Sequence, residues 1–395
     1  MGEGGDGVMA KLGEICTVVS GSTPKTSVAS YWDGSIKWIT PAELNNESFY
    51  ITDSVRHITE EGKEKTGLSS FPAGTVILSS RAPIGKTAIA GCEMCCNQGF
   101  KNLICSEKIY NEYLYFFLKS KTNYLNSLGR GATFKEISKT IVENIEVPLP
   151  DINQQKGIAE KFKKLEELIS LRKQQLAKLD ELIKARFVEM FGDPADNVNN
   201  LPASPMTAIC QIIDGDRGKN YPKQEEFSDS GFCLFLNAKN VTVQGFSFEN
   251  CTYITEEKDA LLRNGKLCRG DVVLTTRGTI GNLAFYDTSV PYENIRINSG
   301  MVILRMNKQV VSEIFFIEQF KMQLDSIKNR IASGSAQPQL PISTMNKIEM
   351  ILPPIELQNQ FAAFVGRVDK QKQTVQQSLE KLELMKKALM QEYFG

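Results

Sequence analysis

Hydrophobic residues recur alternately four and three positions apart in two long segments, 158–190 and 361–393. In the first segment these positions hold Ile158, Phe162, Leu165, Ile169, Arg172, Leu176, Leu179, Ile183, Arg186 and Met190. In the second they hold Phe361, Val365, Val368, Lys372, Val375, Leu379, Leu382, Lys386, Leu389 and Tyr393. This spacing, kept for about four and a half heptads, predicts two long helices that each carry a coiled-coil seam. Two basic residues interrupt each seam, so the surface opposite is not wholly apolar.

Each helix could instead pack only on its own domain. A helix of about 37 residues is about 55 Å long, and a domain of about 150 residues is too small to cover that whole face. We therefore expect the two helices to pack against each other. Because each helix leads away from its own domain, pairing along the seams requires an antiparallel arrangement that brings Gly395 back to the first domain. Gly192 and Gly395 follow the two helices, as is typical of a left-handed C-terminal stop.

The chain also repeats itself. Residues 71–89, FPAGTVILSSRAPIGKTAI, align without a gap with residues 267–285, LCRGDVVLTTRGTIGNLAF, and FVEMFG (187–192) aligns with MQEYFG (390–395). A repeat of about half the chain predicts a duplicated domain-plus-helix unit with approximate two-fold symmetry. The offset between the copies is constant through the helical segments and drifts in the domains. Insertions were therefore accepted in the domains and not in the helices.

The segments before the two helices combine short β-branched runs with one aromatic-rich helical stretch each, 111–128 and 312–331. A Gly-rich loop follows each stretch, and a strand then leads into a Pro-rich exit. The fold class we expect is α+β, with two similar domains separated by a pair of long antiparallel helices and an internal pseudo-two-fold repeat. The expected boundaries are 1–7 for a disordered leader, 8–150 for the first domain, 151–192 for a central helical spacer, 193–354 for the second domain and 355–395 for a distal helical spacer.

Composition and charge narrow the function only a little. The 46 basic residues balance the 46 acidic residues, so a DNA-binding role would require basic residues gathered on one face, or a partner that supplies part of the positive charge. Nine scattered cysteines, no secretory signal and no apolar run long enough to span a bilayer predict a cytoplasmic protein with free thiols and no membrane contact.

Two domains held at a fixed spacing suit a DNA target. Two half-sites about one helical turn apart, roughly 34–36 Å, require two reading domains at a matching distance. Because the two domains differ in their loops, the half-sites should differ in sequence.

Several motifs carry a resemblance to a known family. KLGEICTVVSGSTPKT (11–26), YWDGSIKWITPAEL (31–44), SSRAPIGKTAI (79–89) and the exits followed by Gln155 and Gln358 resemble the specificity subunit of type I DNA restriction–modification systems. The resemblance covers essentially the whole chain after the leader, and the order of motifs, repeated twice, is highly specific. The second half departs from the pattern at 214–218, DGDRG, where the first half has GSTPK at 21–25.

The resemblance implies a non-catalytic subunit with two target-recognition domains for double-stranded DNA. It also implies that two adenine methyltransferase subunits and two ATP-driven restriction/translocase subunits are directed to an asymmetric bipartite sequence. S-adenosylmethionine and ATP with Mg would then be bound by those partners and not by this chain. Apolar positions off the seam could form the flank for the methyltransferase or could pack on the chain's own domains: Leu168, Leu171, Leu182, Leu384 and Met385.

Candidate DNA contacts are basic and polar residues on Gly-containing loops. Arg81 and Arg277 occupy one aligned position, which suits phosphate anchoring or a structural ion pair but not base discrimination. The Gly-rich loops differ strongly between the copies, so they suit base readout, with a plain surface loop as the alternative. The complete set of candidates is Lys25, Arg81, Lys86, Arg130, Thr133, Lys135, Arg217, Lys219, Arg277, Ser335 and Gln337.

Three patterns suggest other chemistry without supporting it. Gly85-Lys86-Thr87 resembles the end of a phosphate-binding loop, but Ser80 stands where the leading Gly is needed and the second copy has Gly281-Asn282-Leu283. Cys92, Cys95, Cys96 and Cys105 lack a second well-spaced pair for zinc. His57, the one histidine, has no triad around it. We therefore predict no catalytic residue and no metal site in this chain.

Two alternatives remain open from the sequence. One is a coiled-coil scaffold that joins protein partners and never contacts DNA, which the neutral net charge favours slightly. The other is an enzyme that uses the loop at Gly85, and nucleotide binding by the chain alone would reveal it.

Overall fold

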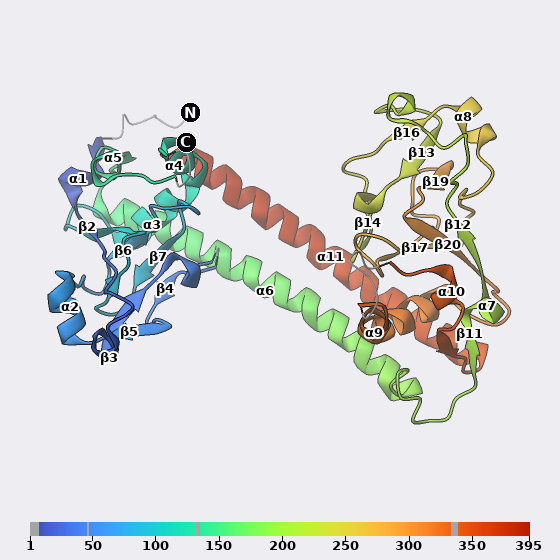
Figure 1. Ribbon diagram of the computed structural model, residues 1–395. Coiled ribbons are helices and arrows are strands. Elements are labelled where there is room, and N and C mark those ends of the chain that lie inside the picture. Colours follow the sequence, from blue (N-terminus) through green and yellow to red (C-terminus); the bar gives the residue numbers. More distant parts are fainter. Residues whose placement is uncertain (1–7, 46, 132–134, 333–338) are drawn as a thin grey trace. The chain divides into compact units, whose positions relative to one another are not determined.

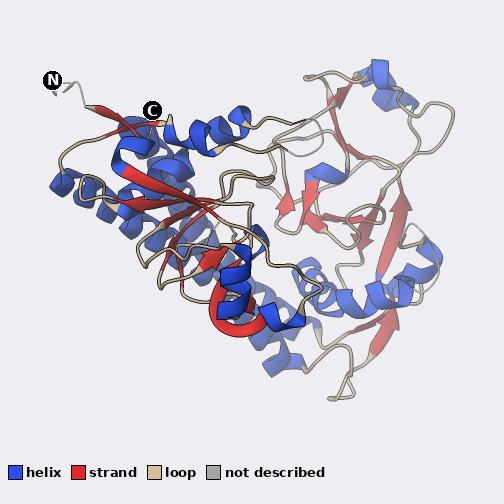
Figure 2. Ribbon diagram, turned by 60° about the vertical axis from the view of Figure 1, so that its left-hand side comes forward, coloured by secondary structure: helices blue, strands red, loops and turns tan. Residues whose placement is uncertain are grey.

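The structure is a computed structural model that describes residues 8–45, 47–131, 135–332 and 339–395. The chain divides into two compact units, residues 1–173 with 377–395 and residues 174–376. Helices and strands are mixed in both units (Figures 1 and 2). Among the described residues, no helix has the length and apolar character needed to cross a membrane.

The first unit contains two sheets. The larger has the order β2-β9-β6-β7-β4, in which only β4 and β7 run parallel; its strands are β2 (Cys16–Ser20), β4 (Tyr50–Ile51), β6 (Val76–Leu78), β7 (Thr87–Ala90) and β9 (Lys101–Cys105). The smaller has the order β5-β3-β8, with β3 (Trp32–Ile39), β5 (Arg56–Ile58) and β8 (Cys95–Cys96). A third pair joins β1 (Met9–Lys11) to β10 (Glu146–Pro148). The helices before the long one are α1 (Leu12–Ile15), α2 (Glu60–Thr66), α3 (Asn111–Ser120), α4 (Thr122–Leu128) and α5 (Lys139–Glu143), with short 3-10 turns η1 (Ala29–Tyr31) and η2 (Pro41–Glu43).

The second unit repeats this plan. Its antiparallel sheet has the order β12-β20-β17-β18, with β12 (Cys210–Asp214), β17 (Asp271–Thr275), β18 (Leu283–Phe285) and β20 (Met301–Met306). The sheet β16-β13-β19 consists of β13 (Cys233–Leu236), β16 (Tyr253–Ile254) and β19 (Ile295–Ile297). The remaining strands are β11 (Ala203–Pro205), paired with β21 (Glu349–Ile351), and the hairpin β14 (Val241–Thr242) and β15 (Gly245–Phe246). The helices are α7 (Met206–Ile209), α8 (Glu256–Leu261), α9 (Glu313–Ala332) and α10 (Ile342–Met345), with 3-10 turns η3 (Gln224–Glu226) and η4 (Ala238–Asn240).

The pairing of strands confirms the predicted repeat. In both smaller sheets, one central strand pairs antiparallel on one side and parallel on the other. The aligned glycines Gly74 and Gly270 both have positive φ, 87° and 96°, as do Gly85 and Gly281, 92° and 94°. Because positive φ suits glycine, the sequence keeps glycine at these turns in both copies.

One predicted helix is broken. The stretch 111–128 forms α3 and α4, because Lys121 leaves helical geometry at φ −93° and ψ 11°. The Thr122 hydroxyl donates to the Lys119 carbonyl at 2.9 Å, which competes with continuation of the helix. The corresponding stretch of the second unit, α9, is continuous.

The two long helices, α6 (Ile152–Phe191) and α11 (Ile355–Phe394), match the predicted segments. Gly192 ends α6 with a φ of 80°, as its predicted stop requires. Near each helix start a buried glutamine ties the Pro-rich exit to the domain. Gln155 donates to the carbonyls of Lys108 and Pro150 and accepts from the Tyr110 N–H, and Gln358 donates to those of Val310 and Pro353 and accepts from the Ser312 N–H.

Within the first unit, the start of α6 packs antiparallel against the end of α11. The Phe162 ring stacks on Phe394 with centroids 5.6 Å apart, and Lys386 forms an ion pair with Glu166 at 2.6 Å. Further along, Arg172 Nε donates to Ser378 Oγ at 3.2 Å. This order confirms the antiparallel pairing and places Gly395 in the first unit, as predicted.

Within the second unit, the end of α6 pairs with the start of α11. Phe187 contacts Phe361 edge to face with centroids 5.3 Å apart, and Lys372 forms an ion pair with Asp180 at 2.6 Å. Lys386 and Lys372 therefore interrupt the seam because a carboxylate on α6 faces each of them. The other predicted seam residues are buried or half-buried: Ile158, Leu165, Ile169, Leu176, Leu179, Ile183, Val365, Val368, Val375, Leu379, Leu382 and Leu389.

Candidate nucleic-acid interface

In the first unit, several strands end or begin at one edge, and the loops there are hydrogen-bonded to one another. Ser22 N–H donates to the Cys96 carbonyl at 3.1 Å, Ser80 N–H to the Gly99 carbonyl at 2.7 Å, and Ile137 N–H to the Ser80 carbonyl at 2.9 Å. We call this set the first loop cluster: residues 21–25, 40–44, 80–86, 97–100, 129–131 and 135–137.

The second unit builds the equivalent edge. Asn298 N–H donates to the Leu236 carbonyl at 3.1 Å, Thr276 N–H to the Gly300 carbonyl at 2.9 Å, and Leu340 N–H to the Thr276 carbonyl at 3.0 Å. The second loop cluster comprises residues 215–219, 237–240, 276–282, 298–300 and 339–340. Among the described residues, five loops of the first cluster thus have a counterpart with different residues in the second.

The loops that begin at Gly21 and Gly215 show that the alignment of the two halves must be shifted here. Gly21 and Gly215 each follow the first strand of the large sheet, and a Cβ at either would lie 2.2 Å from a main-chain oxygen, that of Asn97 or Asn298. Because only glycine fits there, these two residues are equivalent, and the apparent departure at 214–218 is a shift of one residue. The shift makes Lys25 and Lys219 equivalent, and both are exposed.

The aligned arginines have different surroundings. Arg81 Nε donates to Glu136 Oε2 at 2.8 Å, and the two residues form a β-bridge. Arg277 forms the same bridge with Gln339, which carries no charge. Of the two predicted roles, Arg81 has that of a structural ion pair, whereas the residue facing Arg277 cannot form one.

Glu136 has a second basic neighbour, Lys101, at 3.4 Å. Burial alone would raise the pKa of Glu136, but the hydrogen bond from Arg81 and the charge of Lys101 hold that pKa below its ordinary value. The carboxylate is therefore ionised at neutral pH and offsets positive charge in the first loop cluster.

Lys86 points into the fold. Its ammonium donates to the carbonyls of Pro41 at 3.0 Å and Leu44 at 2.6 Å. The aligned Asn282 bonds the equivalent loop of the second unit, because its Nδ2 donates to the Val241 carbonyl at 2.9 Å. The lysine of the Gly85-Lys86-Thr87 pattern thus holds a neighbouring loop in place.

The other predicted DNA contacts differ in their exposure to solvent and in their hydrogen bonds. Lys25, Arg130 and Lys135 are exposed in the first, and Lys219 and Arg277 are exposed in the second. Arg217, also exposed, donates to Asp214 at 3.1 Å and to the Ser299 carbonyl at 3.3 Å. Thr133, Ser335 and Gln337 lie outside the described residues.

Sequence reasoning missed one loop in each cluster. Asn97-Gln98-Gly99 follows β8 and Asn298-Ser299-Gly300 follows β19, and in each the Asn Oδ1 accepts the N–H of the Gly at 2.8 or 2.9 Å. The repeated Asn-x-Gly spacing was the available signal. Its short length and weakly similar flanks hid it.

Asp216 was also missed as an organising residue. Its carboxylate accepts the N–H groups of Gly218 at 2.7 Å, Arg263 at 2.7 Å and Asn264 at 3.4 Å. Burial alone would raise its pKa, but these three hydrogen bonds hold the pKa below its ordinary value. Asp216 therefore fixes the loop that carries Arg217 and Lys219.

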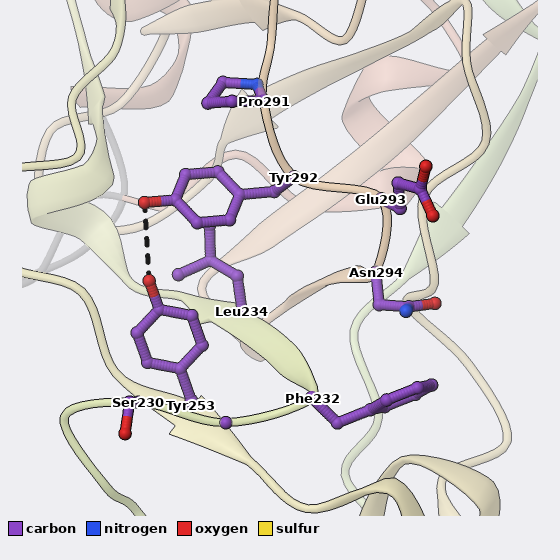
Figure 3. Close-up of a pocket in the computed structure, with 9 residues that line it drawn as sticks. Ser230, Phe232, Leu234, Tyr253, Pro291, Tyr292, Glu293 and Asn294 are labelled. Atoms are coloured by element: carbon purple, nitrogen blue, oxygen red, sulfur yellow. Dashed lines mark hydrogen bonds between the residues drawn. The ribbon is translucent and has the colours of Figure 1, made fainter.

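A pocket of about 380 Å³ lies elsewhere in the second unit. Figure 3 shows Tyr253 and Tyr292 within it, their hydroxyls 3.3 Å apart. Phe232 and Asn294, also in its lining, precede the parallel strands β13 and β19, whereas the second loop cluster follows those strands. The pocket is therefore at the opposite end of this sheet from the cluster.

The cysteines and the histidine occupy separate surroundings. Cys95 packs with Trp32 and Trp38, whereas Cys96 belongs to a different hydrophobic cluster and accepts a hydrogen bond from Asn102. Within the described part of the chain, no three His, Cys, Asp or Glu side chains are grouped to hold a metal ion. His57 Nε2 lies 3.1 Å from Asp53 Oδ1.

Comparisons with known proteins identify the family. Residues 6–181 and 206–384 each match the family described as type I restriction modification DNA specificity domain. The type I restriction enzyme MjaIX specificity subunit of Methanocaldococcus jannaschii is 29% identical over 388 residues, covering 90% of this chain and 85% of that protein. The EcoKI specificity subunit of Escherichia coli is 23% identical over 391 residues, covering 92% and 81%.

Solved structures share the fold. The type I restriction–modification S subunit from M. genitalium superposes with a TM-score of 0.57 at 17% identity, covering 100% of this chain and 98% of that one. A chain from a structure of the type I R-M system gives a TM-score of 0.60 at 16% identity, covering 98% of both. The chain therefore belongs to the family of type I restriction modification DNA specificity domains and contains two copies of that domain.

Proposed function

We propose that this chain is the sequence-specific DNA-binding subunit of a type I restriction–modification complex, and that each unit reads one half of an asymmetric bipartite site. The observation that carries the proposal is the pair of loop clusters, which keep the same hydrogen-bonded frame and differ in the polar residues they present. A reader of two different half-sites needs that combination. Membership of the family supports the same role, and so does the description of the relatives as specificity subunits.

The proposed DNA contacts are exposed residues of the two clusters. Lys25, Arg130 and Lys135 would serve the first half-site, and Arg217, Lys219 and Arg277 the second. Arg81 would contact phosphate more weakly because Glu136 already neutralises it. We leave Lys86 out of this set, since its ammonium is bound to main-chain oxygens inside the fold. The domain boundaries at 150, 192 and 354 stay predictions.

The proposed partners are two methyltransferase subunits and two restriction/translocase subunits in the cytoplasm, with S-adenosylmethionine and ATP with Mg bound by them. Support for a protein partner on the helices comes from apolar side chains off the seam. Leu168, Leu171 and Leu182 are 45–49% exposed, and Leu384 and Met385 are 68% and 54% exposed, so none of the five is covered by its own domain. Burying such residues is the usual source of protein–protein affinity.

A binding measurement tests the proposal against a scaffold role. The chain, co-expressed with its methyltransferase, is titrated onto genomic DNA fragments in a mobility-shift assay at 50 to 200 mM salt. A DNA reader should lose affinity steeply with salt, because phosphate contacts release counterions, and should prefer a subset of fragments. If the chain is only a scaffold, Arg130→Ala and Arg217→Ala will leave the preferred fragments and the salt dependence unchanged, because only the methyltransferase then contacts DNA.

A further inference from the structure

The Asn-x-Gly loops are the most tightly framed part of each cluster. In the first unit, Asn97 N–H donates to the Ile39 carbonyl at 3.1 Å, and the Gly99 carbonyl accepts from Ser80 at 2.7 Å. Gly21 packs so closely on this loop that any side chain there would overlap the Asn97 and Cys96 oxygens. In the second unit, Asn298 N–H donates to the Leu236 carbonyl, the Gly300 carbonyl accepts from Thr276, and Gly215 packs against the Asn298 oxygen.

Only the middle residue of the loop changes between the copies. It is Gln98, exposed, in the first unit and Ser299, half-buried, in the second. A fixed frame around a variable polar residue is what base discrimination requires, because the frame sets the position and the side chain sets the hydrogen-bonding pattern.

A neighbouring hydroxyl orients the Gln98 amide. Thr23 Oγ1 donates to Gln98 Oε1, from the loop that follows β2. The equivalent residue of the second unit is Arg217, which bonds the Ser299 carbonyl at 3.3 Å and leaves the Ser299 hydroxyl free of that contact. In both units, therefore, the residue two positions after the packed glycine supports the loop.

We infer that Gln98 and Ser299 each contact a base edge, and that Thr23 is a positioning residue for Gln98. This inference rests on the proposed DNA-reading function. A glutamine amide held at a fixed angle can donate to N7 and accept from N6 of adenine in the major groove, whereas a serine hydroxyl can pair with several bases. The first half-site accordingly contains an adenine that Gln98 selects, and Ser299 selects less stringently in the second.

The test starts from the sequence that the methyltransferase methylates when it is co-expressed with the wild-type chain. Duplexes that carry this sequence, and duplexes with each base pair substituted singly, compete for the complex. Gln98→Ala should lower discrimination about 10- to 100-fold at one adenine of the first half-site and leave every other position unchanged. Gln98→Glu should shift preference at that position to cytosine, since a carboxylate accepts from N4.

Three further variants complete the design. Thr23→Val should lower discrimination at the same base pair by less than Gln98→Ala, with the salt slope of binding unchanged. Ser299→Ala should act only in the second half-site. Gln154→Ala, an exposed glutamine on α6, is the matched control and should change nothing.

The outcomes separate the two claims. If the wild-type complex shows no sequence preference, the proposed function fails. If it does, and Gln98→Ala keeps full discrimination at every position, this inference alone is overturned. Thermal unfolding and non-specific affinity are measured for each variant, and a Gln98→Ala variant that folds and binds but discriminates normally also contradicts the inference.

Discussion

The two units stabilise one position of their shared fold in opposite ways. The strand after the hairpin carries Cys95 in the first unit, buried beside Trp32 and Trp38. The equivalent residue of the second unit is Arg296, on β19, whose guanidinium forms a buried ion pair with Asp259 and donates to the carbonyls of Asn264 and Leu262. The Arg296 and Asp259 side chains are each about 6% exposed. One copy thus packs an apolar cluster where the other satisfies two charges.

Several hydrogen bonds at the helix starts and in the loop clusters, in contrast, are made alike in both units. Gln155 and Gln358, Lys86 and Asn282, and the two Asn-x-Gly loops make matching contacts. The copies therefore differ at a core position beneath the loops, whereas they share hydrogen bonds that hold the loops in place. Loop position is therefore what the fold retains, and loop chemistry is what it varies.

The largest effect on stability should come from placing the cysteine of the first unit at the equivalent position of the second unit. Arg296→Cys should destabilise the second unit by about 3 kcal/mol, because Asp259 would keep only Lys266 as an ion-pair partner and the carbonyls of Asn264 and Leu262 would lose their donor. Hydrogen exchange of α8 and β19 would report the loss locally.

Two variants control for this change. Cys95→Ala in the first unit should cost about 1 kcal/mol, since it removes a small buried side-chain atom and no charge partner. Asp259→Ala combined with Arg296→Cys should cost less than Arg296→Cys alone, since the buried carboxylate that loses its arginine would be absent. A double variant as unstable as the single one would show that the ion pair does not account for the difference between the units.

The buried glutamines offer a matched pair of changes with a smaller effect. Gln155→Leu and Gln358→Leu each leave one main-chain N–H and two carbonyls without their partner, so each should cost about 2 kcal/mol. Denaturant unfolding of the two variants would measure these losses. Unequal costs, differing by more than about 1 kcal/mol, would contradict the claim that the two exits are built alike.

The two units should also differ in how much stability they lose at acidic pH. Burial alone would raise the pKa of Asp259, but the hydrogen bonds from Lys266 and Arg296 hold it below the ordinary value of 3.8. A lowered folded-state pKa stabilises the fold at neutral pH, and this contribution is lost as the pH falls below about 4 and through the folded-state pKa. Hydrogen-exchange protection factors of α8 should therefore fall more than those of α2 between pH 5 and about pH 2.5. Equal losses in the two helices would argue against this difference.

The smallest effect should come from exchanging the residues that face Arg81 and Arg277, and it should appear in DNA binding. Glu136→Gln should free Arg81 and steepen the salt dependence of DNA binding by about one released counterion, with higher affinity. Gln339→Glu should do the reverse for Arg277. Mobility shifts at several salt concentrations would measure both slopes. Unchanged slopes in both variants would remove the two arginines from the DNA-contacting surface.

Patterns with strong periodicity or exact spacing were predictable from the sequence. The seams of α6 and α11, the repeat and the helix stop at Gly192 all follow from residue spacing alone. The loop-cluster geometry was less accessible, because it depends on pairs such as Arg81 with Glu136 and Ser80 with Gly99 that are far apart in the chain. The contacts of Lys86 were inaccessible for the same reason: its acceptors belong to the loop at 41–44, and nothing local in the sequence indicates them.

The most direct test of the two-reader account is a genome-wide map of methylated adenines made by this chain with its methyltransferase. If each unit reads its own half-site, the map will show one recognition sequence in two parts, with different bases in the two parts and a gap of constant length between them. A single uninterrupted recognition sequence, or two identical half-sites, would contradict the proposal that two different units read the DNA.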